Sequence, residues 1–375
     1  MKIINIIAAC ASGGAEILVK DTLISLAKDK TLELELWIMT RVKDSNFQIT
    51  ENSLNFEENY IRSLNEHGIK VRFLEKRVNK DSLKTWLKIR KLYKDIKPDI
   101  IHTHLESVTF NTAIGLLGKG VKQIQTIHNI KIGYPKIQRF FLDKILIKNI
   151  AISREVALNM LEAGLNKHKI EEIPNAVNLE KFRNNEREIK KPKIYLAVGR
   201  LTEQKNHELM IKSYSKFIQK IDNEKEKPLL KIIGEGSKKE KLENLIQELK
   251  MRDYIKLLGV RDNIPELLKE ADVYIMTSKW EGFSISLIEA AASGLPIIAS
   301  NVGSNTLICK NNTNGWIFES EDEVRLTELL GKIQRINLSD LKKMSQNSVE
   351  ISNQYDLEKT SKKLLKLYFE VKRKK

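Results

Sequence analysis

Two glutamates stand close together in the stretch from residue 278 to 294, Ser-Lys-Trp-Glu-Gly-Phe-Ser-Ile-Ser-Leu-Ile-Glu-Ala-Ala-Ala-Ser-Gly. Glu281 lies in a glycine-containing loop and Glu289 in a run of helix formers, so at most roughly 10 Å of helix separates them. Ionised carboxylates only accept hydrogen bonds, and a pair of them at the mouth of a cleft suits a ligand with many hydroxyls, such as a sugar or a ribose. The alternative is an ordinary pair of surface glutamates.

Two cations follow a strand-like run at 194–198, Ile-Tyr-Leu-Ala-Val. Arg200 and Lys205 lie in the next segment, Gly-Arg-Leu-Thr-Glu-Gln-Lys-Asn-His. An arginine offers two parallel donors and a lysine a point charge, so together they can hold a diphosphate. By themselves they are equally compatible with a surface pair.

Three histidines are expected at the ends of strands. His102 and His104 lie in Pro-Asp-Ile-Ile-His-Thr-His, and His128 lies in Ile-Gln-Thr-Ile-His-Asn. An open α/β sheet binds ligands beyond the carboxyl ends of its strands, where an imidazole can donate to a hydroxyl or exchange a proton. A hydrogen-bonded structural histidine is the alternative, which we favour for His102.

Two glycine-containing turns follow other strand-like runs. Gly13 and Gly14 precede a helical pattern at 15–28, and Gly234 and Gly236 follow the apolar run at 229–233. Such loops can bring backbone N–H groups to an anionic ligand at a helix N-terminus. A plain turn is the alternative for Gly13 and Gly14.

With their neighbours, these motifs resemble the nucleotide-sugar site of the family-four retaining glycosyltransferases. The resemblance rests on the spacing of Glu281 and Glu289, the Ala-Ser-Gly-Leu-Pro-Ile-Ile-Ala-Ser that follows, the Val-Gly at 302–303, Gly-Arg-Leu-x-x-x-Lys-Asn and Thr-Ile-His-Asn. It covers nearly the whole chain and is strongest from 174 to 315.

The resemblance implies a role for each residue. Glu281 contacts hydroxyls of the donor sugar, and Glu289 contacts the ribose. Arg200 and Lys205 bind the diphosphate and stabilise it as the leaving group, while His128 lies near the centre of sugar transfer. The other implied residues are Gly14, Gly234, Gly236, Gly282, Phe283 and Ser284 on the donor side, and Gly13, His102 and His104 on the acceptor side.

Two departures from the family pattern bear on which sugar is donated. The family often has an acidic residue shortly after the Val-Gly, where this chain has Ser-Asn-Thr-Leu at 304–307. It often has Gly or Pro at the position of Ser284.

The elements that position these residues predict an α/β fold. Apolar runs at 272–277 and 296–299 read as strands around a short helix, with Ser284 or Ser286 as its cap and Gly294 as its left-handed C-terminal residue. Strand-loop-helix units recur along the chain, which predicts doubly wound parallel sheets. The resemblance implies the GT-B fold, two facing Rossmann-like domains with the donor in the cleft between them.

We expect three segments in this architecture. Residues 1–173 form an acceptor-side domain, and residues 174–355 form the nucleotide-sugar-binding domain. Residues 356–375 form a final helix and basic tail that cross back to the first domain. A length of 375 residues fits two domains, because single cores stop growing below that size.

Composition limits the partners and the location. A balance of 65 Lys and Arg against 49 Asp and Glu gives a net charge of +16, which favours anionic partners. With only Cys10 and Cys309, and no apolar run near the ~20 residues of a membrane span, we expect a cytoplasmic protein. The apolar start at 3–11 is too short for a signal peptide.

Two basic stretches suggest a membrane surface. Residues 70–97 carry eleven Lys or Arg, and residues 131–148 interleave basic and aromatic side chains. In the first stretch we expect an amphipathic helix with Leu83, Trp86, Leu87 and Tyr93 near one side. Docking on anionic lipid is the functional interpretation and solvated helix faces are the alternative, whereas nucleic acid is not expected because no nucleic-acid-binding motif accompanies the charge.

The sequence therefore predicts a retaining glycosyltransferase that moves a sugar from a nucleoside diphosphate sugar to a lipid-linked or saccharide acceptor. We place it in cell-surface polysaccharide or glycolipid assembly, at the inner face of the cell membrane. Beyond the donor it needs no cofactor, and without Asp-x-Asp or a Cys/His cluster we expect no metal site. Two alternatives are a nucleotide-sugar epimerase of the same architecture and a non-catalytic basic nucleic-acid-binding protein.

Overall fold

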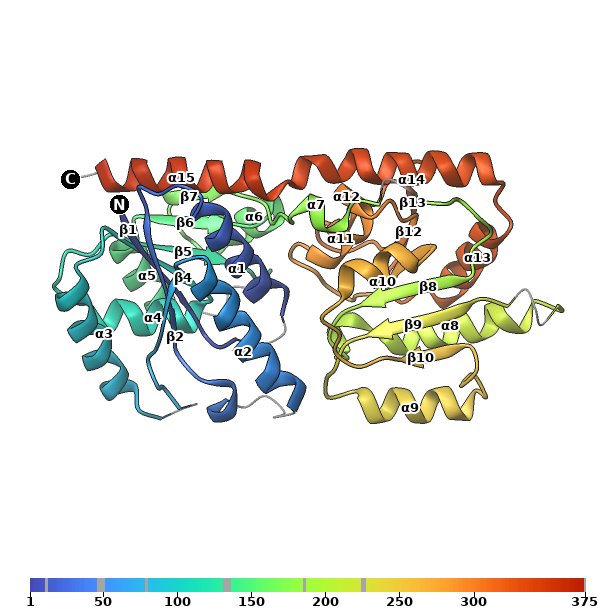
Figure 1. Ribbon diagram of the computed structural model, residues 1–375, viewed down its shortest axis with the longest axis horizontal. Coiled ribbons are helices and arrows are strands. Elements are labelled where there is room, and N and C mark those ends of the chain that lie inside the picture. Colours follow the sequence, from blue (N-terminus) through green and yellow to red (C-terminus); the bar gives the residue numbers. More distant parts are fainter. Residues whose placement is uncertain are drawn as a thin grey trace. The chain divides into compact units, whose positions relative to one another are not determined.

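The computed structural model describes residues 1–10, 13–45, 51–77, 80–130, 136–184, 187–223 and 227–373. The chain divides into two compact units: unit 1 is Met1–Asn175 with Leu357–Lys375, and unit 2 is Ala176–Asp356. Each unit is a parallel β-sheet flanked by helices (Figure 1). The predicted α/β class with two parallel sheets is confirmed.

Unit 1 contains a seven-stranded sheet in the order β3-β2-β1-β4-β5-β6-β7. Its strands are β1 (Lys2–Ile7), β2 (Glu33–Ile38), β3 (Lys70–Phe73), β4 (Ile100–His104), β5 (Gln123–Ile127), β6 (Lys148–Ala151) and β7 (Ile170–Glu172). Its helices are α1 (Gly14–Leu26), α2 (Glu51–Glu66), α3 (Ser82–Ile96), α4 (Glu106–Gly115), α5 (Lys136–Ile145), α6 (Arg154–Glu162) and α15 (Leu357–Arg373).

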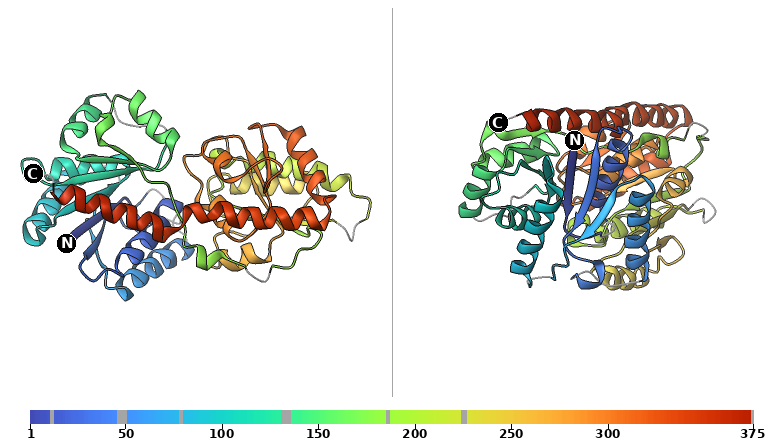
Figure 2. Two further views of the ribbon diagram at one scale, coloured as in Figure 1. Left: turned by 90° about the horizontal axis from the view of Figure 1, so that it is seen from above. Right: turned by 60° about the vertical axis from the view of Figure 1, so that its left-hand side comes forward.

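Strand β1 shows why this sheet is buried on both faces. Its alternate residues Ile3 and Ile7 join one apolar cluster, with side chains of α1 and α15, whereas Ile4 and Ile6 join another, with side chains of α3 and α4. A strand between two helical layers is apolar on both sides, so the near-continuous isoleucine run is what a parallel sheet requires. Figure 2 shows the helices on either side of the sheet. Asn5 interrupts the run on the α1 and α15 face.

Unit 2 contains a six-stranded parallel sheet in the order β10-β9-β8-β11-β12-β13. Its strands are β8 (Ile194–Val198), β9 (Leu229–Ile233), β10 (Ile255–Leu257), β11 (Val273–Met276), β12 (Ile297–Ser300) and β13 (Gly315–Phe318). Its helices are α7 (Leu179–Phe182), α8 (His207–Gln219), α9 (Lys239–Glu248), α10 (Ile264–Glu270), α11 (Ile285–Ala292), α12 (Asn305–Ile308), α13 (Glu323–Gln334) and α14 (Leu338–Ser352).

The strand order of both sheets reverses at the first strand of the unit. In unit 1 the reversal lies between β1 and β4, and in unit 2 between β8 and β11. Consecutive helices leave on opposite faces at such a point, which opens a crevice beyond the carboxyl ends of the two strands. These two crevices are where ligand-binding side chains are expected.

The helix that carries Glu289 begins and ends where the sequence predicts. Gly294 has φ +71°, the left-handed conformation expected at the end of α11. Ser284 occupies the predicted N-cap position, but its side chain makes no capping hydrogen bond, and its hydroxyl lies 3.3 Å from that of Ser286. The predicted cap position is therefore right, whereas the expected side-chain bond is not formed.

The face with which the amphipathic helix α3 packs overlaps the predicted one in part. Thr85 and Ile89 are buried and Tyr93 packs against the same core cluster, whereas Leu83 and Leu87 are 66% and 59% exposed. Trp86 is half-buried and donates from Nε1 to Oδ1 of Asn111 on α4. The predicted apolar side is therefore right for Trp86 and Tyr93 and wrong for Leu83 and Leu87. Among the described helices, none is both long enough and apolar enough to cross a bilayer.

Candidate active site

The switch point of unit 2 brings together two of the predicted residues. Lys205 lies in the turn after β8, and Glu281 lies in the loop between β11 and α11. The Nζ atom of Lys205 is 2.5 Å from Oε1 of Glu281, and these side chains are only 15% and 7% exposed. Residues 76 positions apart in the sequence thus form a buried ion pair at the edge of the sheet where a ligand is expected.

Neighbouring hydroxyls hold this pair in place. Ser278 Oγ donates to the same carboxylate oxygen of Glu281 at 2.6 Å. Thr277 Oγ1 lies 3.0 Å from the carbonyl oxygens of both Lys205 and Asn206, to which it can donate. The two loops are therefore joined by side-chain contacts as well as by the ion pair.

Arg200 lies in the same loop as Lys205 but is exposed. Its Nη2 donates to Gln204 Oε1 at 3.4 Å, a long hydrogen bond. Because the guanidinium lies at the surface, it can reorient toward an anionic ligand at little desolvation cost. Its role in binding a diphosphate stays a prediction.

Gly234 and Gly236 allow two loops to lie against one another. Their φ angles are +143° and +158°, and a Cβ atom at either position would lie 2.0 Å from the carbonyl oxygen of Gly199 or 2.4 Å from that of Leu201. Side chains at these positions would also need a backbone conformation that L-residues avoid. The glycines thus shape the loop of Arg200 and Lys205, whether or not they contact a ligand.

A third glycine supports Glu281. Gly303 has φ +53°, and a Cβ there would lie 1.8 Å from the carbonyl oxygen of Glu281. The adjacent Ser304 donates from Oγ to the carbonyl of Gly282 at 3.0 Å. The Val-Gly motif therefore packs directly against the Glu281 loop. Ser304, which stands where the family often has an acidic residue nearby, adds a hydrogen bond to the same loop.

Glu289 and Phe283 occupy different environments. Glu289 lies on α11, is 9% exposed and interacts electrostatically with Tyr274. The ring of Phe283 packs edge-on against that of Tyr355, with centroids 5.2 Å apart. The Phe283 side chain is therefore used for packing, which leaves its backbone for any donor contact. The predicted contact of Glu289 with a ribose stays a prediction.

In unit 1, the glycines after β1 begin the first helix. Gly13 is the residue before α1 and Gly14 is its first residue. Residues 11 and 12 of this loop lie outside the described residues. The predicted ligand contacts of both glycines stay predictions.

The histidines of unit 1 form a cluster beside the other switch point. His104 is the last residue of β4 and His128 follows β5, but His102 lies within β4, so the expectation that each histidine ends a strand is wrong for His102. His102 is buried, with Nδ1 2.7 Å from the hydroxyl of Tyr368 and Nε2 2.8 Å from Oγ1 of Thr126. Both of its ring nitrogens are therefore used inside the protein, as the structural alternative requires.

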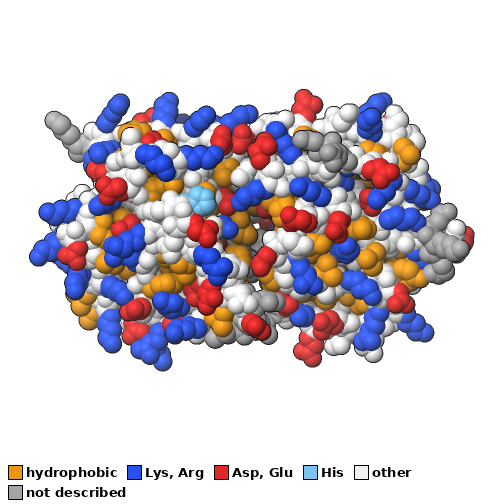
Figure 3. All heavy atoms as spheres, viewed as in Figure 1, with side chains coloured by type: hydrophobic (Ala, Val, Ile, Leu, Met, Phe, Trp, Pro, Cys, Tyr) orange, Lys and Arg blue, Asp and Glu red, His pale blue; other side chains and the backbone are white. Residues whose placement is uncertain are grey.

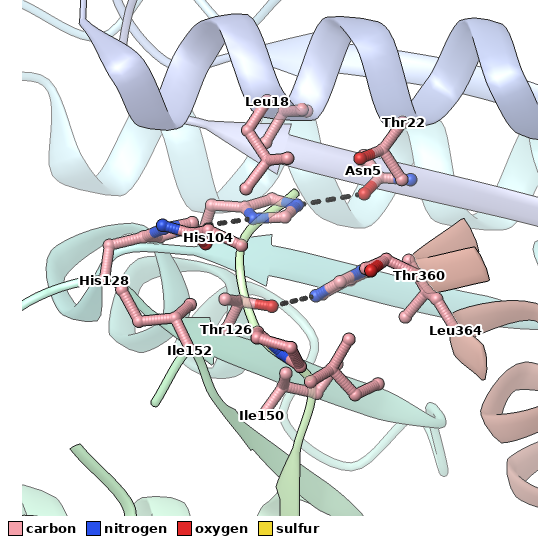
Figure 4. A pocket seen from close by; sticks show the side chains of 15 residues that line it. Asn5, Leu18, Thr22, His104, Thr126, His128, Ile150, Ile152, Thr360 and Leu364 are labelled. Atoms are coloured by element: carbon pink, nitrogen blue, oxygen red, sulfur yellow. Dashed lines mark hydrogen bonds between the residues drawn. The ribbon is translucent and has the colours of Figure 1, made fainter. Parts of the chain in front are cut away.

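His104 and His128 bond to each other at the edge of a cavity (Figure 4). His104 Nδ1 is 3.3 Å from His128 Nε2, and His104 Nε2 is 3.0 Å from Oδ1 of Asn5. Burial lowers the pKa of His128 to about 4 and that of His102 to about 3, and it holds the pKa of His104 well below its usual value. All three rings are therefore neutral near pH 7.

Sequence reasoning missed several residues of both sites. The sequence predicts no role for Asn5, Tyr368 or Ser278, although they bond to His104, His102 and Glu281 respectively. Asn5 carried a signal, because it is a lone polar residue within an isoleucine run. Tyr368 carried none, since it comes from a helix at the far end of the sequence.

The basic stretches contribute surface charge. In the view of Figure 3, Lys and Arg side chains are interspersed with Asp and Glu over the visible face of unit 1. Residues 78–79 of the first stretch and 131–135 of the second lie outside the described residues.

Within the parts of the chain that are described, no group of three or more His, Cys, Asp and Glu side chains could hold a metal ion.

Two family models match the chain. Residues 12–181 match the model described as Glycosyltransferase Family 4, and residues 178–350 match the one described as Glycosyl transferases group 1. The chain belongs to the family-4 glycosyltransferases. The predicted family and the glycosyltransferase activity are thereby confirmed, which decides against the two alternatives.

Similar proteins and solved structures cover most of the chain. The family-4 glycosyltransferase described here is 28% identical over 319 residues to an Escherichia coli UDP-Gal:α-D-GlcNAc-diphosphoundecaprenol α-1,3-galactosyltransferase, covering 77% of this chain and 80% of that protein. A crystal structure of Anabaena HepE in complex with UDP-glucose superposes with a TM-score of 0.81 at 16% identity, covering 98% of this chain and 99% of that one. A crystal structure of a Rickettsia africae glycosyltransferase superposes with a TM-score of 0.80 at 18% identity, covering 100% of this chain and 99% of that one.

Proposed function

We propose that this glycosyltransferase moves a sugar from a nucleoside diphosphate sugar to a lipid-linked or saccharide acceptor, with retention of the anomeric configuration. The E. coli relative supports a lipid-linked acceptor, because its name gives a diphosphoundecaprenol substrate. The Anabaena structure supports a nucleoside diphosphate sugar, because it was solved with UDP-glucose. Assembly of a cell-surface polysaccharide or glycolipid is the process that such an acceptor serves.

The single observation that carries this proposal is the buried ion pair of Lys205 with Glu281 at the switch point of unit 2. A lysine there can meet the diphosphate while the carboxylate beside it meets sugar hydroxyls, so one pair addresses both sides of the bond that breaks. As that bond breaks, negative charge grows on the diphosphate. Lys205 and Arg200 stabilise this charge, and this stabilisation accelerates the transfer.

We propose further that these two cations supply the leaving-group charge without a bound metal ion, and that the donor is the only small-molecule partner besides the acceptor. Family-4 sequence resemblance and the absence of an Asp-x-Asp motif support this. Sugar-transfer activity measured in the presence of a chelator tests this assignment.

We also propose that unit 1 docks on an anionic membrane surface at the inner face of the cell membrane. On α3, the exposed Leu83 and Leu87 lie beside Lys84 and Lys91, which are also exposed. Exposed leucines beside lysines suit the interface between lipid headgroups and acyl chains. Docking there would bring the enzyme to a lipid-linked acceptor, because the lipid part of such an acceptor lies in the membrane.

A donor screen followed by product analysis tests the function. Thermal shift with nucleotides and nucleotide sugars identifies the donor, because a bound ligand raises the unfolding temperature. Transfer to a short-chain diphospholipid saccharide is then followed by NMR, in which the anomeric coupling of the product reports retention or inversion. An inverted product, or complete loss of activity in EDTA with rescue by Mg²⁺ or Mn²⁺, contradicts the corresponding part of the proposal.

A further inference from the structure

A line of hydrogen bonds leads from the interior of unit 1 to His128. It begins at Asn5 on β1, passes through His104 on β4 and ends at His128 after β5, with distances of 3.0 and 3.3 Å (Figure 4). All three residues line the same cavity, which lies against α1 and α15. The line therefore crosses the switch point between β1 and β4.

The direction of each hydrogen bond follows from the chemistry of the amide. The Oδ1 atom of Asn5 can only accept, so Nε2 of His104 carries the proton of that ring. In a neutral imidazole the other nitrogen then has a lone pair, and Nδ1 of His104 accepts from Nε2–H of His128. The same rule leaves Nδ1 of His128 with a lone pair and no proton.

The Asn5 amide presents its oxygen to His104. Oδ1 of Asn5 is the atom that lies 3.0 Å from Nε2 of His104, whereas Nδ2 of Asn5 is buried and has no hydrogen-bond partner among the described residues. Tyr368 belongs to a separate group: its hydroxyl lies 2.7 Å from Nδ1 of His102, and Nε2 of His102 lies 2.8 Å from Oγ1 of Thr126.

The end of the line is open. Nδ1 of His128 is buried, and no hydrogen-bond partner for it exists among the described residues. Burial also lowers the pKa of His128 to about 4, which keeps the ring neutral with one proton, on Nε2. An unpaired acceptor in a buried position is costly, and a ligand that donates a hydrogen bond removes that cost.

We infer that Asn5 and His104 are positioning residues that hold His128 with Nδ1 as a hydrogen-bond acceptor for a sugar hydroxyl. The nature of the hydroxyl rests on the proposed function, whereas the proton arrangement does not. A phosphate oxygen at the same place would meet a lone pair instead of a proton. The line thus selects the hydroxyl-bearing part of a substrate at this point and directs the diphosphate away from it.

Two substitutions of His104 separate this role from simple packing. Asparagine places its amide where Nδ1 was, so His104→Asn can still accept from His128 although it loses Asn5. Glutamine places its amide where Nε2 was, so His104→Gln keeps Asn5 and loses His128. We expect His104→Gln to lower kcat at least roughly tenfold and His104→Asn by less than about threefold, with nucleoside diphosphate affinity unchanged in both.

Thr103→Val is the matched control. Thr103 is buried on the same strand, and its hydroxyl bonds to Thr109 Oγ1 at 2.9 Å and to the carbonyl oxygen of Ile124 at 3.1 Å rather than to the histidines. The variant loses these buried hydrogen bonds without touching the line, so kcat is expected to change little. Equal losses in both His104 variants, or a milder effect of glutamine, would overturn the positioning role.

The proton arrangement is read directly from the wild-type protein. The chain has six histidines, so ¹⁵N-histidine labelling with long-range ¹H–¹⁵N spectra gives few signals, assigned with the variants. We expect His104 and His128 with bare Nδ1 and protonated Nε2 at neutral pH, and a change at Nδ1 of His128 when the donor sugar binds. A proton on Nδ1 of either ring sinks the inference even if sugar transfer is observed, whereas the expected spectrum without any transfer contradicts the proposed function alone.

Discussion

The substitution Glu281→Ala leaves the buried positive charge of Lys205 without its ion-pair partner. The side chain of Lys205 is 15% exposed and its Nζ lies 2.5 Å from the carboxylate that the substitution removes. Ser278 loses its acceptor at the same time. Breaking a buried ion pair from one side typically costs about 3–5 kcal/mol, and we expect about 3 kcal/mol of the free energy of unfolding to be lost because Lys205 keeps some access to water.

The reverse substitution gives a second side of a double-mutant cycle. Lys205→Met removes the cation and leaves Glu281 with the hydrogen bond from Ser278. When both substitutions are made, no unpaired charge remains. The double variant should therefore lose less stability than the sum of the single variants, by about 1–3 kcal/mol.

The same cycle predicts opposite effects on ligand binding. In Glu281→Ala the charge of Lys205 is no longer neutralised, so the affinity for a nucleoside diphosphate should stay the same or rise while turnover falls. In Lys205→Met that affinity should fall by roughly ten- to a hundredfold, because a charged hydrogen bond contributes about 1.5–3 kcal/mol. Arg200→Ala serves as a comparison, since it removes a cation that does not pair with Glu281.

Urea unfolding and calorimetric titration with UDP decide the matter. The reasoning is refuted if the stability losses of the two single variants simply add in the double variant, because the 2.5 Å contact would then carry no coupling. It is also refuted if Glu281→Ala loses nucleoside diphosphate affinity as strongly as Lys205→Met. In that case the carboxylate and not the lysine would hold the nucleotide.

Glu289→Ala should weaken the nucleotide sugar and the free nucleoside diphosphate alike, by roughly ten- to a hundredfold, because the ribose is common to both; titration of both ligands shows it, and loss of only the sugar-bearing ligand would reverse its assignment with that of Glu281. The free energy of unfolding should fall as the pH drops from about 6.5 toward 4, since the unfolded chain binds protons there while His102 and His128, with pKa values lowered to about 3 and 4, do not. The expected slope is about 1.4 kcal/mol per pH unit for each histidine, and urea unfolding at pH 7.5 and 5.5 that gave equal stabilities would contradict it. Leu83→Ser with Leu87→Ser should reduce binding to vesicles that contain anionic lipid, and binding that is equal on neutral vesicles would exclude the proposed membrane surface.

The strands and the unit 2 site were readable from local sequence. The run at 194–198 is strand β8 with the same bounds, and Arg200 and Lys205 follow it as expected. Carboxyl ends of parallel strands meet at one edge of a sheet, so placing Lys205 and Glu281 after strands already placed them near one another. What local sequence lacks is the pairing order, since the adjacency of β8 and β11 comes from the sheet topology.

The errors arise where a distant partner decides the outcome. On α3, packing against the sheet and against α4 determines that Ile89 rather than Leu87 is buried. The line of hydrogen bonds from Asn5 through His104 to His128 joins β1, β4 and the loop after β5. No spacing within the sequence encodes such a set, because each member comes from a separate strand or helix.

Helix α15 has a consequence for the order in which the protein is made. Leu364, Leu367 and Tyr368 belong to the core of unit 1, yet they follow unit 2 in the chain. At 5–20 residues per second, a ribosome needs about 10–40 s to synthesise Ala176–Asp356, and until then nascent unit 1 lacks one wall of its core. During this time His102 has no tyrosine to bond with and the apolar groove for α15 is open to water. Chaperones therefore have a defined surface to protect in the growing chain, and truncation before residue 357 would leave that surface open permanently.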